Sequence, residues 1–159
     1  MNYIPIITRT LRKIGLDVYR FDPAWVMVKC QDTAMGRLMK LLHHYKINTI
    51  MDIGANVGQY ARNLRINGYN GKIVSFEPLS AAFSILKKNA TNDPLWDTVN
   101  IALGNENIDE REIHIAGNSI SSSFLDMLPR HVGALPDSIY MGNEKVVVRT
   151  IDSIFHDCH

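Results

Sequence analysis

The sequence is most informative at the stretch Asp52-Ile-Gly-Ala-Asn-Val-Gly58. A short β-branched run at 48–53 leads into it, and residues 61–66 after it have helical composition, so the order is strand, glycine turn, helix. Glycine permits a tight turn and a close approach of a ligand to the backbone, and the start of a helix offers unpaired N–H groups. We interpret this stretch as a turn that binds a nucleotide cofactor, the alternative being an ordinary strand-to-helix turn.

Two features of the turn indicate which cofactor it binds. The dinucleotide fingerprint GxGxxG has its first glycines two positions apart, whereas Gly54 and Gly58 are four apart. Asp52 ends the strand, where a carboxylate attracts an ammonium group and repels a pyrophosphate. Both features favour S-adenosylmethionine over NAD and disfavour a nicotinamide-dependent oxidoreductase. Two alternatives stay open: Asp52 could cap the helix, and Asn56 could be a ligand contact or a left-handed turn residue.

A second acidic residue, Glu77, follows Gly58 by nineteen positions and ends a predicted strand at 72–76. An acidic side chain there can accept hydrogen bonds from both ribose hydroxyls, although Glu77 and Pro78 could also form a solvated turn. Leu103 closes a third strand on the side where an adenine ring would lie. The predicted cofactor-binding residues are Asp52, Gly54, Ala55, Asn56, Gly58, Glu77, Pro78 and Leu103.

Strands and helices alternate along the chain. Strands are expected at 48–53, 72–76 and 98–103, and helices at 33–45, 61–66 and 80–89. Strict alternation indicates an α/β fold, namely a Rossmann-like three-layer sandwich with a mainly parallel sheet. Two later strands, at 111–116 and 145–151, are polar at alternate positions, which is typical of antiparallel or edge strands. The long segment between them is expected to contain one helical turn at 124–128.

The predicted helices have recognisable caps and apolar sides. Asp32 or Thr33 is expected to cap the first helix, and Ser80 the third. The side chains expected to pack are Leu38, Leu41 and Leu42 in the first helix, and Phe83, Ile85 and Leu86 in the third.

Length and composition exclude several classes of protein. The chain has 159 residues, of which 46% are hydrophobic and 21% charged, so we expect one globular domain rather than disorder. The net charge of +1 provides no field that attracts nucleic acid or an acidic membrane. No apolar run approaches the roughly 20 residues of a transmembrane helix. Cys30 and Cys158 lack CxxC spacing, so we expect reduced thiols and a cytoplasmic protein.

The N-terminal part is expected to be a helical segment, 1–47, that packs on the cofactor-binding half, 48–159. Apolar residues recur at helical spacing opposite basic ones, so an amphipathic helix is predicted; they are Ile4, Ile7, Leu11 and Ile14. Its short stripe and modest charge favour docking on the domain over a membrane-surface anchor.

No catalytic residue can be assigned from the sequence. His114 and His131 are candidate bases by residue type only. The serines of 119–123 could bind an acceptor or cofactor, but a polar turn explains them more simply. The closing residues 156–159 contain possible metal ligands without a partner pair, so no metal site is predicted. Trp25 and Trp96 are interpreted as packing residues.

The succession of motifs resembles FkbM-type methyltransferases over about residues 48–155. The stretches that carry the resemblance are Asp52-Ile-Gly-Ala-Asn-Val-Gly58, Phe76-Glu-Pro78, Ala102-Leu-Gly104, Ser119-Ile-Ser-Ser-Ser123 and Val148-Arg-Thr-Ile-Asp152. The resemblance implies a class I Rossmann-like fold and S-adenosylmethionine-dependent methyl transfer, usually to oxygen. It implies small-molecule, sugar or lipid-type acceptors, and the near-neutral net charge predicts no nucleic-acid partner.

One part of the family pattern is missing. In the family, a strand with the pattern Asp-x-x-Gly-x-Glu follows soon after the position of Asp152, whereas this sequence ends at His159. That strand would form the second wall of the ligand crevice and pair with strand 48–53. We therefore expect a partial methyltransferase fold. The alternative is an inactive module that self-associates through its open sheet edge as a homo-oligomer.

Overall fold

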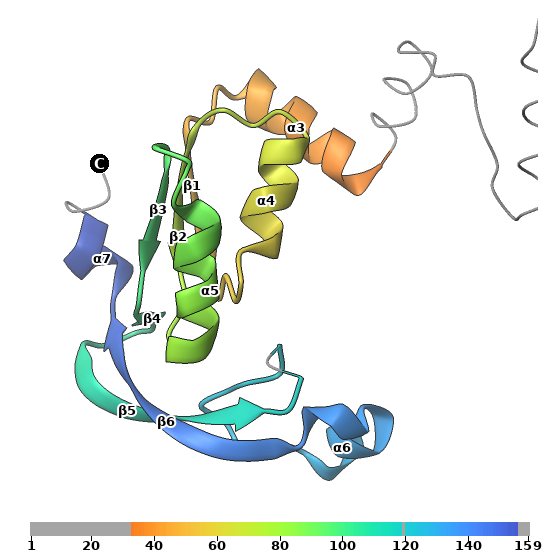
Figure 1. Ribbon diagram of the computed structural model, residues 1–159, viewed down its shortest axis with the longest axis vertical. Coiled ribbons are helices and arrows are strands. Elements are labelled where there is room, and N and C mark those ends of the chain that lie inside the picture. The colour runs from red at the N-terminus through yellow and green to blue at the C-terminus, as the bar shows by residue number, and fades with distance from the viewer. Residues whose placement is uncertain (1–32, 119, 156–159) are drawn as a thin grey trace, which may run out of the picture.

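The computed structural model describes residues 33–118 and 120–155. The predicted N-terminal amphipathic helix and Trp25 lie outside these residues. The first part is a three-stranded parallel sheet in the order β1-β2-β3, formed by β1 (Thr49–Ile53), β2 (Lys72–Phe76) and β3 (Trp96–Val99). Its helices are α3 (Ala34–His44), α4 (Gln59–Ile66) and α5 (Ser80–Ala90). Strand, turn and helix thus follow one another as the sequence predicts (Figure 1).

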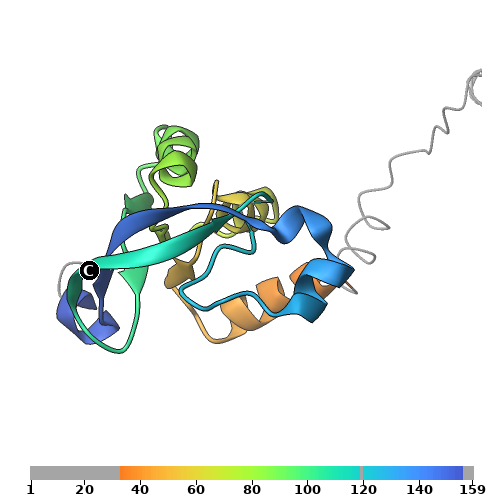
Figure 2. The ribbon, with the colours of Figure 1, turned by 90° about the horizontal axis from the view of Figure 1, so that it is seen from below.

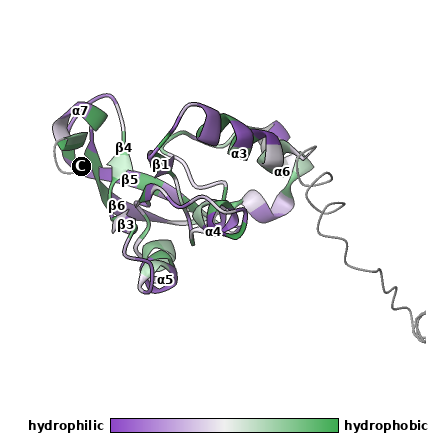
Figure 3. Ribbon diagram, turned by 90° about the horizontal axis from the view of Figure 1, so that it is seen from above, coloured by the Kyte–Doolittle hydropathy of each residue, from purple (hydrophilic) through white to green (hydrophobic). Residues whose placement is uncertain are grey.

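The main core lies between this sheet and helices α4 and α5. Every second residue of a strand points to the same face of the sheet, and Ile73 of β2 and Trp96 of β3 both point to the face that the helices cover. There they pack with Leu64 of α4 and Leu86 of α5. Helix α3 adds its apolar side to the same cluster, and Thr33 caps it by accepting a hydrogen bond from the Gly36 amide. The mixed colouring of α3 and α5 in Figure 3 reflects this two-sided pattern.

The opposite face of the sheet carries a smaller cluster. Val74 and Phe76 are buried there, and Ile154 of the short helix α7 (Ile151–Ile154) packs against them. Among the described residues, α7 is the helix that reaches this face. The structure is therefore a mixed α/β fold with a parallel sheet and one well-covered face, in agreement with a Rossmann-like fold.

A second sheet follows in the chain. It has the order β4-β6-β5 and consists of β4 (Ala102–Leu103), β5 (Ile108–Ala116) and β6 (Tyr140–Arg149). Strands β5 and β6 form a long antiparallel ribbon, as predicted for the two later strands. Figure 2 shows this ribbon running from α7 at one end to α6 (Pro129–Ala134) at the other; the 3₁₀ helix η1 (Pro136–Ser138) follows α6. Helix α5 rests on the ribbon through Leu79 and Ala82, which pack with its apolar residues Ile113, Val146 and Val148.

The predicted strand at 98–103 is wrong, because the structure divides this segment between the two sheets. Strand β3 ends at Val99, and β4 begins at Ala102 and pairs with β6. The Asn100 side chain donates hydrogen bonds to the carbonyls of Glu77 and Pro78, at 2.8 and 2.9 Å. Asn100 thus joins the strand end to the turn after β2 at the point where the chain leaves the parallel sheet.

Several local predictions are also corrected. Ser80 does not cap α5: the cap position is Leu79, and the Ser80 amide instead donates to the Glu144 side chain of β6. Ile85 is 49% exposed. The predicted turn of helix at 124–128 is not formed, because Ser123 pairs with the backbone of His114 and the chain becomes helical only at α6.

Two further expectations differ in detail. Leu41 of α3 is exposed, whereas Leu38 and Leu42 pack on the core. The strand predicted at 145–151 ends at Arg149, because Thr150 caps α7 by accepting a hydrogen bond from the Ser153 amide. Among the described residues, no helix is both long enough and apolar enough to span a membrane.

Candidate functional site

The glycine-containing turn joins β1 to α4 through three residues with positive φ. These are Gly54, Asn56 and Gly58, with φ of 73°, 50° and 86°. The amides of Gly54 and Ala55 both donate to the carbonyl of Phe76 at 3.0 Å, so the turn wraps around the end of β2. The left-handed interpretation of Asn56 is confirmed.

The two glycines of the turn have different surroundings. A Cβ added at Gly58 would lie 2.8 Å from Leu86 Cδ1 and from Trp96 Cζ2, so Gly58 is required for packing of the turn against α5 and β3. A Cβ added at Gly54 would meet no atom within 4 Å. The space in front of Gly54 is therefore available to a ligand.

Glu77 is held rigidly at the end of β2. Its Oε2 accepts a hydrogen bond from the Asn56 amide at 2.8 Å, and its Oε1 accepts one from the Leu79 amide at 2.9 Å. Burial raises the pKa of Glu77 above its ordinary value; the two backbone donors oppose the rise, and the nearby charges of Glu144 and Asp52 add to it. The carboxyl group thus bridges the turns that follow β1 and β2.

Asp52 lies on the neighbouring strand, opposite Ser75 in the register. The Ser75 hydroxyl donates to Asp52 Oδ2 at 3.2 Å. Burial raises the pKa of Asp52, and the hydrogen bond from Ser75 partly offsets the rise. Asp52 does not cap α4, whose cap position is Gly58.

A cavity of about 290 Å³ lies beside both carboxyl groups. In Figure 1 the ends of β1 and β2 face the ribbon. Six predicted residues line it: Asp52, Gly54, Ala55, Asn56, Glu77 and Pro78. Gly58 and Leu103 are not among its lining residues: Gly58 packs beneath the turn, and Leu103 packs on the opposite face of the sheet near Val74 and Phe76.

Most of the remaining lining residues were not found from the sequence. Gln59 and Tyr60 begin α4 immediately after the glycine turn, and this position is a signal that could have identified them. Leu79 follows Pro78 directly. Ile113 and Ile120 come from the second sheet and its loop, and no local pattern connects them to the turn. Ser122 belongs to the serine cluster that the sequence offered as a possible contact with an acceptor or cofactor, and it lines the cavity.

A larger cavity, of about 680 Å³, lies along β3 and is bordered by Lys87 of α5 and Ile154 of α7. None of the predicted cofactor-binding residues lines it. We take the smaller cavity as the candidate site, because parallel α/β sheets bind ligands at the carboxyl ends of their strands.

His114 and Trp96 are not among the residues that line the smaller cavity. His114 stacks on Tyr140 with ring centroids 4.7 Å apart, and its Nδ1 lies 2.8 Å from Asn143 Oδ1. His131 belongs to α6. Trp96 is buried in the main core, which confirms its interpretation as a packing residue.

The serine cluster forms local hydrogen bonds. The Ser121 hydroxyl accepts from the Asn118 side chain, Ser122 Oγ from the Ala116 amide, and Ser123 Oγ from the Leu125 amide. These bonds are those of a polar turn, and Ser122 also lines the smaller cavity. Residues 156–159 lie outside the part of the chain that the structure describes. Within the described part, no group of three or more potential metal ligands is present.

A parallel α/β sheet with two acidic strand ends and a glycine turn beside a cavity agrees with a Rossmann-like fold. Residues 52–158 match the family model of the methyltransferase FkbM domain. The chain therefore belongs to the FkbM methyltransferase family. Searches of curated proteins and of solved structures found no match.

Proposed function

We propose that this protein binds S-adenosylmethionine and transfers its methyl group to an oxygen atom of a small-molecule, sugar or lipid-type acceptor. Membership of the family supports methyl transfer. The cofactor assignment depends on one observation: two buried carboxyl groups, those of Asp52 and Glu77, line the same cavity as Gly54.

The donor groups of the cavity fit this cofactor. Each carboxylate oxygen has two lone pairs, so Glu77 can accept ribose hydroxyl hydrogen bonds in addition to its two backbone bonds. Asp52 can pair with the ammonium of the amino-acid part. The described residues that line the cavity include no Lys or Arg, which disfavours a phosphate-bearing cofactor.

S-adenosylmethionine supplies a methyl group that its positively charged sulfur already activates. The protein then has to bind the cofactor and the acceptor and orient them toward each other. In the transfer, the C–S bond breaks as the new C–O bond forms, and the acceptor hydroxyl loses its proton to a base or to water. In this proposal Asp52 holds the amino-acid part of the cofactor and Glu77 holds its ribose. Ile113 and Ile120 supply apolar surface on the ribbon side of the cavity.

Calorimetric titration with S-adenosylhomocysteine tests the proposal. We expect binding by the natural sequence, and weakening by about 1–3 kcal/mol in Glu77→Ala if two ribose hydrogen bonds are lost. Glu110→Ala is the matched control, because Glu110 is an exposed carboxylate of β5 that pairs with Lys145. Equal affinities in the natural sequence and Glu77→Ala would reject the role of Glu77, and binding of NADH in preference would reject the cofactor.

A second candidate function is self-association through the open edge of the parallel sheet. Among the described strands, β1 pairs only with β2, and Ile53 at its end is 56% exposed. An unpaired strand edge can pair with a second copy of the chain. Light scattering tests this candidate, because a stable monomer that binds S-adenosylhomocysteine tightly would contradict it.

A further inference from the structure

A chain of buried hydrogen bonds leads from the core to Asp52. Trp96 Nε1 lies 2.9 Å from Ser75 Oγ, and Ser75 Oγ lies 3.2 Å from Asp52 Oδ2. Trp96, Ser75 and Asp52 are 6%, 0% and 8% exposed. This series of hydrogen bonds crosses all three strands of the parallel sheet on its helix-covered face.

Chemistry sets the direction of these bonds. An indole N–H can only donate, so Ser75 Oγ accepts a hydrogen bond from Trp96, and the Ser75 hydroxyl donates one to the Asp52 carboxylate. A hydroxyl that accepts one hydrogen bond becomes a better donor in the next, because successive bonds polarise one another. The indole therefore strengthens the hold of Ser75 on Asp52.

The far end of the chain of bonds cannot move easily. Gly58 is so close to the Trp96 ring that an added Cβ would lie 2.8 Å from it, and Leu86 packs at the same point. Ser75 and Trp96 do not line the smaller cavity, whereas Asp52 does. Any effect of Ser75 or Trp96 on a ligand in that cavity is therefore transmitted through Asp52 or through general stability.

We propose that Ser75 and Trp96 are positioning residues, which hold the Asp52 carboxylate in the orientation that binds the ammonium group of the cofactor's amino-acid part. This inference rests on the proposed function. Without the Ser75 hydroxyl, the Asp52 side chain loses the bond that sets its plane, and its charged form loses a donor that stabilises it.

Two ligands distinguish positioning from general stability. S-adenosylhomocysteine carries the amino-acid part, whereas 5′-methylthioadenosine lacks it. We expect Ser75→Ala to weaken the first ligand about tenfold, the factor for loss of about 1.4 kcal/mol, and the second less than twofold. Trp96→Phe should act in the same direction with a smaller factor. The control is Ser84→Ala, which removes an exposed hydroxyl that bonds the Ser80 carbonyl.

Comparison with Asp52→Asn shows whether Ser75 acts through Asp52. In an Asp52→Asn background, Ser75→Ala should cause less than a twofold further loss of S-adenosylhomocysteine affinity. Ser75→Thr keeps the hydroxyl and should recover most of the binding. Equal weakening of both ligands by Ser75→Ala, or a tenfold further loss in the Asp52→Asn background, would overturn the proposal.

A measurement without ligand tests the hydrogen-bond chain itself. The indole N–H signal of Trp96 can be followed by NMR, and Trp25→Phe assigns it because the chain has two tryptophans. We expect this signal to shift in Ser75→Ala and in Asp52→Asn, and to remain in place in Ser84→Ala. An unmoved signal in Asp52→Asn would show that Asp52 is not coupled to the indole, and the proposal would fall. If the signal responds but the natural sequence binds neither ligand, both the proposed function and the positioning role fall, and the bonds serve stability alone.

Discussion

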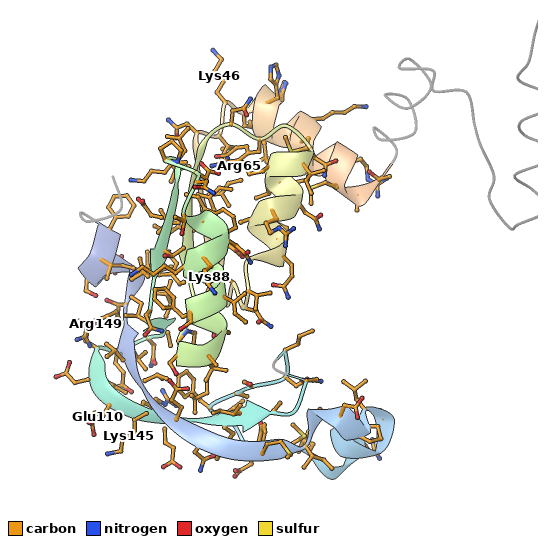
Figure 4. The ribbon with its side chains drawn as sticks, viewed as in Figure 1. Lys46, Arg65, Lys88, Glu110, Lys145 and Arg149 are labelled. Carbon is orange, nitrogen blue, oxygen red and sulfur yellow. The ribbon has the colours of Figure 1, made fainter. Side chains whose placement is uncertain are left out.

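The parallel sheet and the β5–β6 ribbon hold their polar groups in different ways. In the parallel sheet, Asp52, Ser75 and Glu77 are buried. The Ser75 hydroxyl donates a hydrogen bond to Asp52, and Glu77 accepts one from the Asn56 amide in the turn after β1. In the ribbon, charges pair at the surface: Lys145 with Glu110, whose side chains are 69% and 68% exposed. Figure 4 shows Arg65 where α4 meets the parallel sheet, and Glu110 and Lys145 on the outside of the ribbon.

This difference indicates that the parallel sheet is the rigid framework of the site and that the β5–β6 ribbon covers it. A buried polar group is costly unless it is bonded, so the polar groups of the parallel sheet have narrowly defined positions. Exposed ion pairs contribute little to stability, so the ribbon depends on its backbone pairing and its apolar contacts with α5. The parallel sheet supplies the acidic groups of the cavity, and the ribbon supplies apolar side chains that border it.

The largest effect is expected for Gly58→Ala, which breaks the framework. The substitution combines a left-handed backbone with a Cβ that meets Leu86 and Trp96, so we expect a loss of about 3 kcal/mol in the free energy of unfolding. Gly54→Ala is the matched variant: its backbone is also left-handed, but no atom is near, so about 1 kcal/mol is expected. Denaturant unfolding measures both. Equal losses would show that backbone conformation alone accounts for the effect.

Arg65→Ala sharpens the comparison of the two regions. The Arg65 guanidinium donates to the carbonyls of Tyr69, Gly71 and Leu95 and pairs with Asp93 at 2.6 Å, so it joins α4 to two loops. We expect a loss of about 2 kcal/mol, because several charge-assisted hydrogen bonds disappear together. The ribbon counterpart, Lys145→Ala, should leave the thermal midpoint unchanged. A shift of the same size in both variants would contradict the distinction between the regions.

Glu144→Ala tests the contact between the two regions. Glu144 Oε1 accepts a hydrogen bond from the Ser80 amide at 3.0 Å and places a negative charge at the start of α5. We expect a loss of about 1 kcal/mol, as for removal of a helix cap. Glu144→Gln keeps an acceptor oxygen and should lose less. Thermal unfolding of both variants measures the contact, and an unchanged midpoint in Glu144→Ala would show that it contributes nothing.

The smallest effect is a pH dependence at Asp52. Its pKa is higher in the folded protein, so the folded state favours the neutral carboxyl group. The neutral carboxyl group therefore contributes to the free energy of unfolding. This contribution is complete below the pKa of Asp52 in the unfolded chain, about 3.9, and is lost as the pH rises through its pKa in the folded protein. Asp52→Asn carries no such charge, so its thermal midpoint relative to the natural sequence should rise between pH 4 and pH 7. A constant difference across this range would show that burial does not penalise the charge.

Local sequence patterns predicted most of the parallel sheet. Strand 72–76 was predicted with its exact limits, and α3 within one residue at each end, because β-branched runs, caps and helical spacing are short-range signals. The break between β3 and β4 was missed, because it depends on Asn100 reaching the carbonyls of Glu77 and Pro78. Likewise the partner of the Ser80 amide, Glu144, lies 64 positions away in the chain.

The same limit applies to the site. The acidic strand ends and the glycine turn were visible because each lies at a characteristic place in a strand-turn-helix unit. The contributions of Ile113, Ile120 and Ser122 depend on how the ribbon packs across the end of the sheet. The distinct roles of Gly54 and Gly58 also required the structure, since both glycines have positive φ but only Gly58 meets other side chains.

The amino-acid sequence alone determined that strands and helices alternate here, that acidic residues end the first two strands, and that the chain resembles one methyltransferase family. Propensities and spacings of this kind operate over a few residues, so they can be read without knowing the fold. Only the tertiary structure decided that a tryptophan and a serine form a hydrogen-bonded series with one of those acids, and that a distant ribbon borders the cavity. Such contacts depend on packing between segments far apart in the chain, which no local pattern encodes.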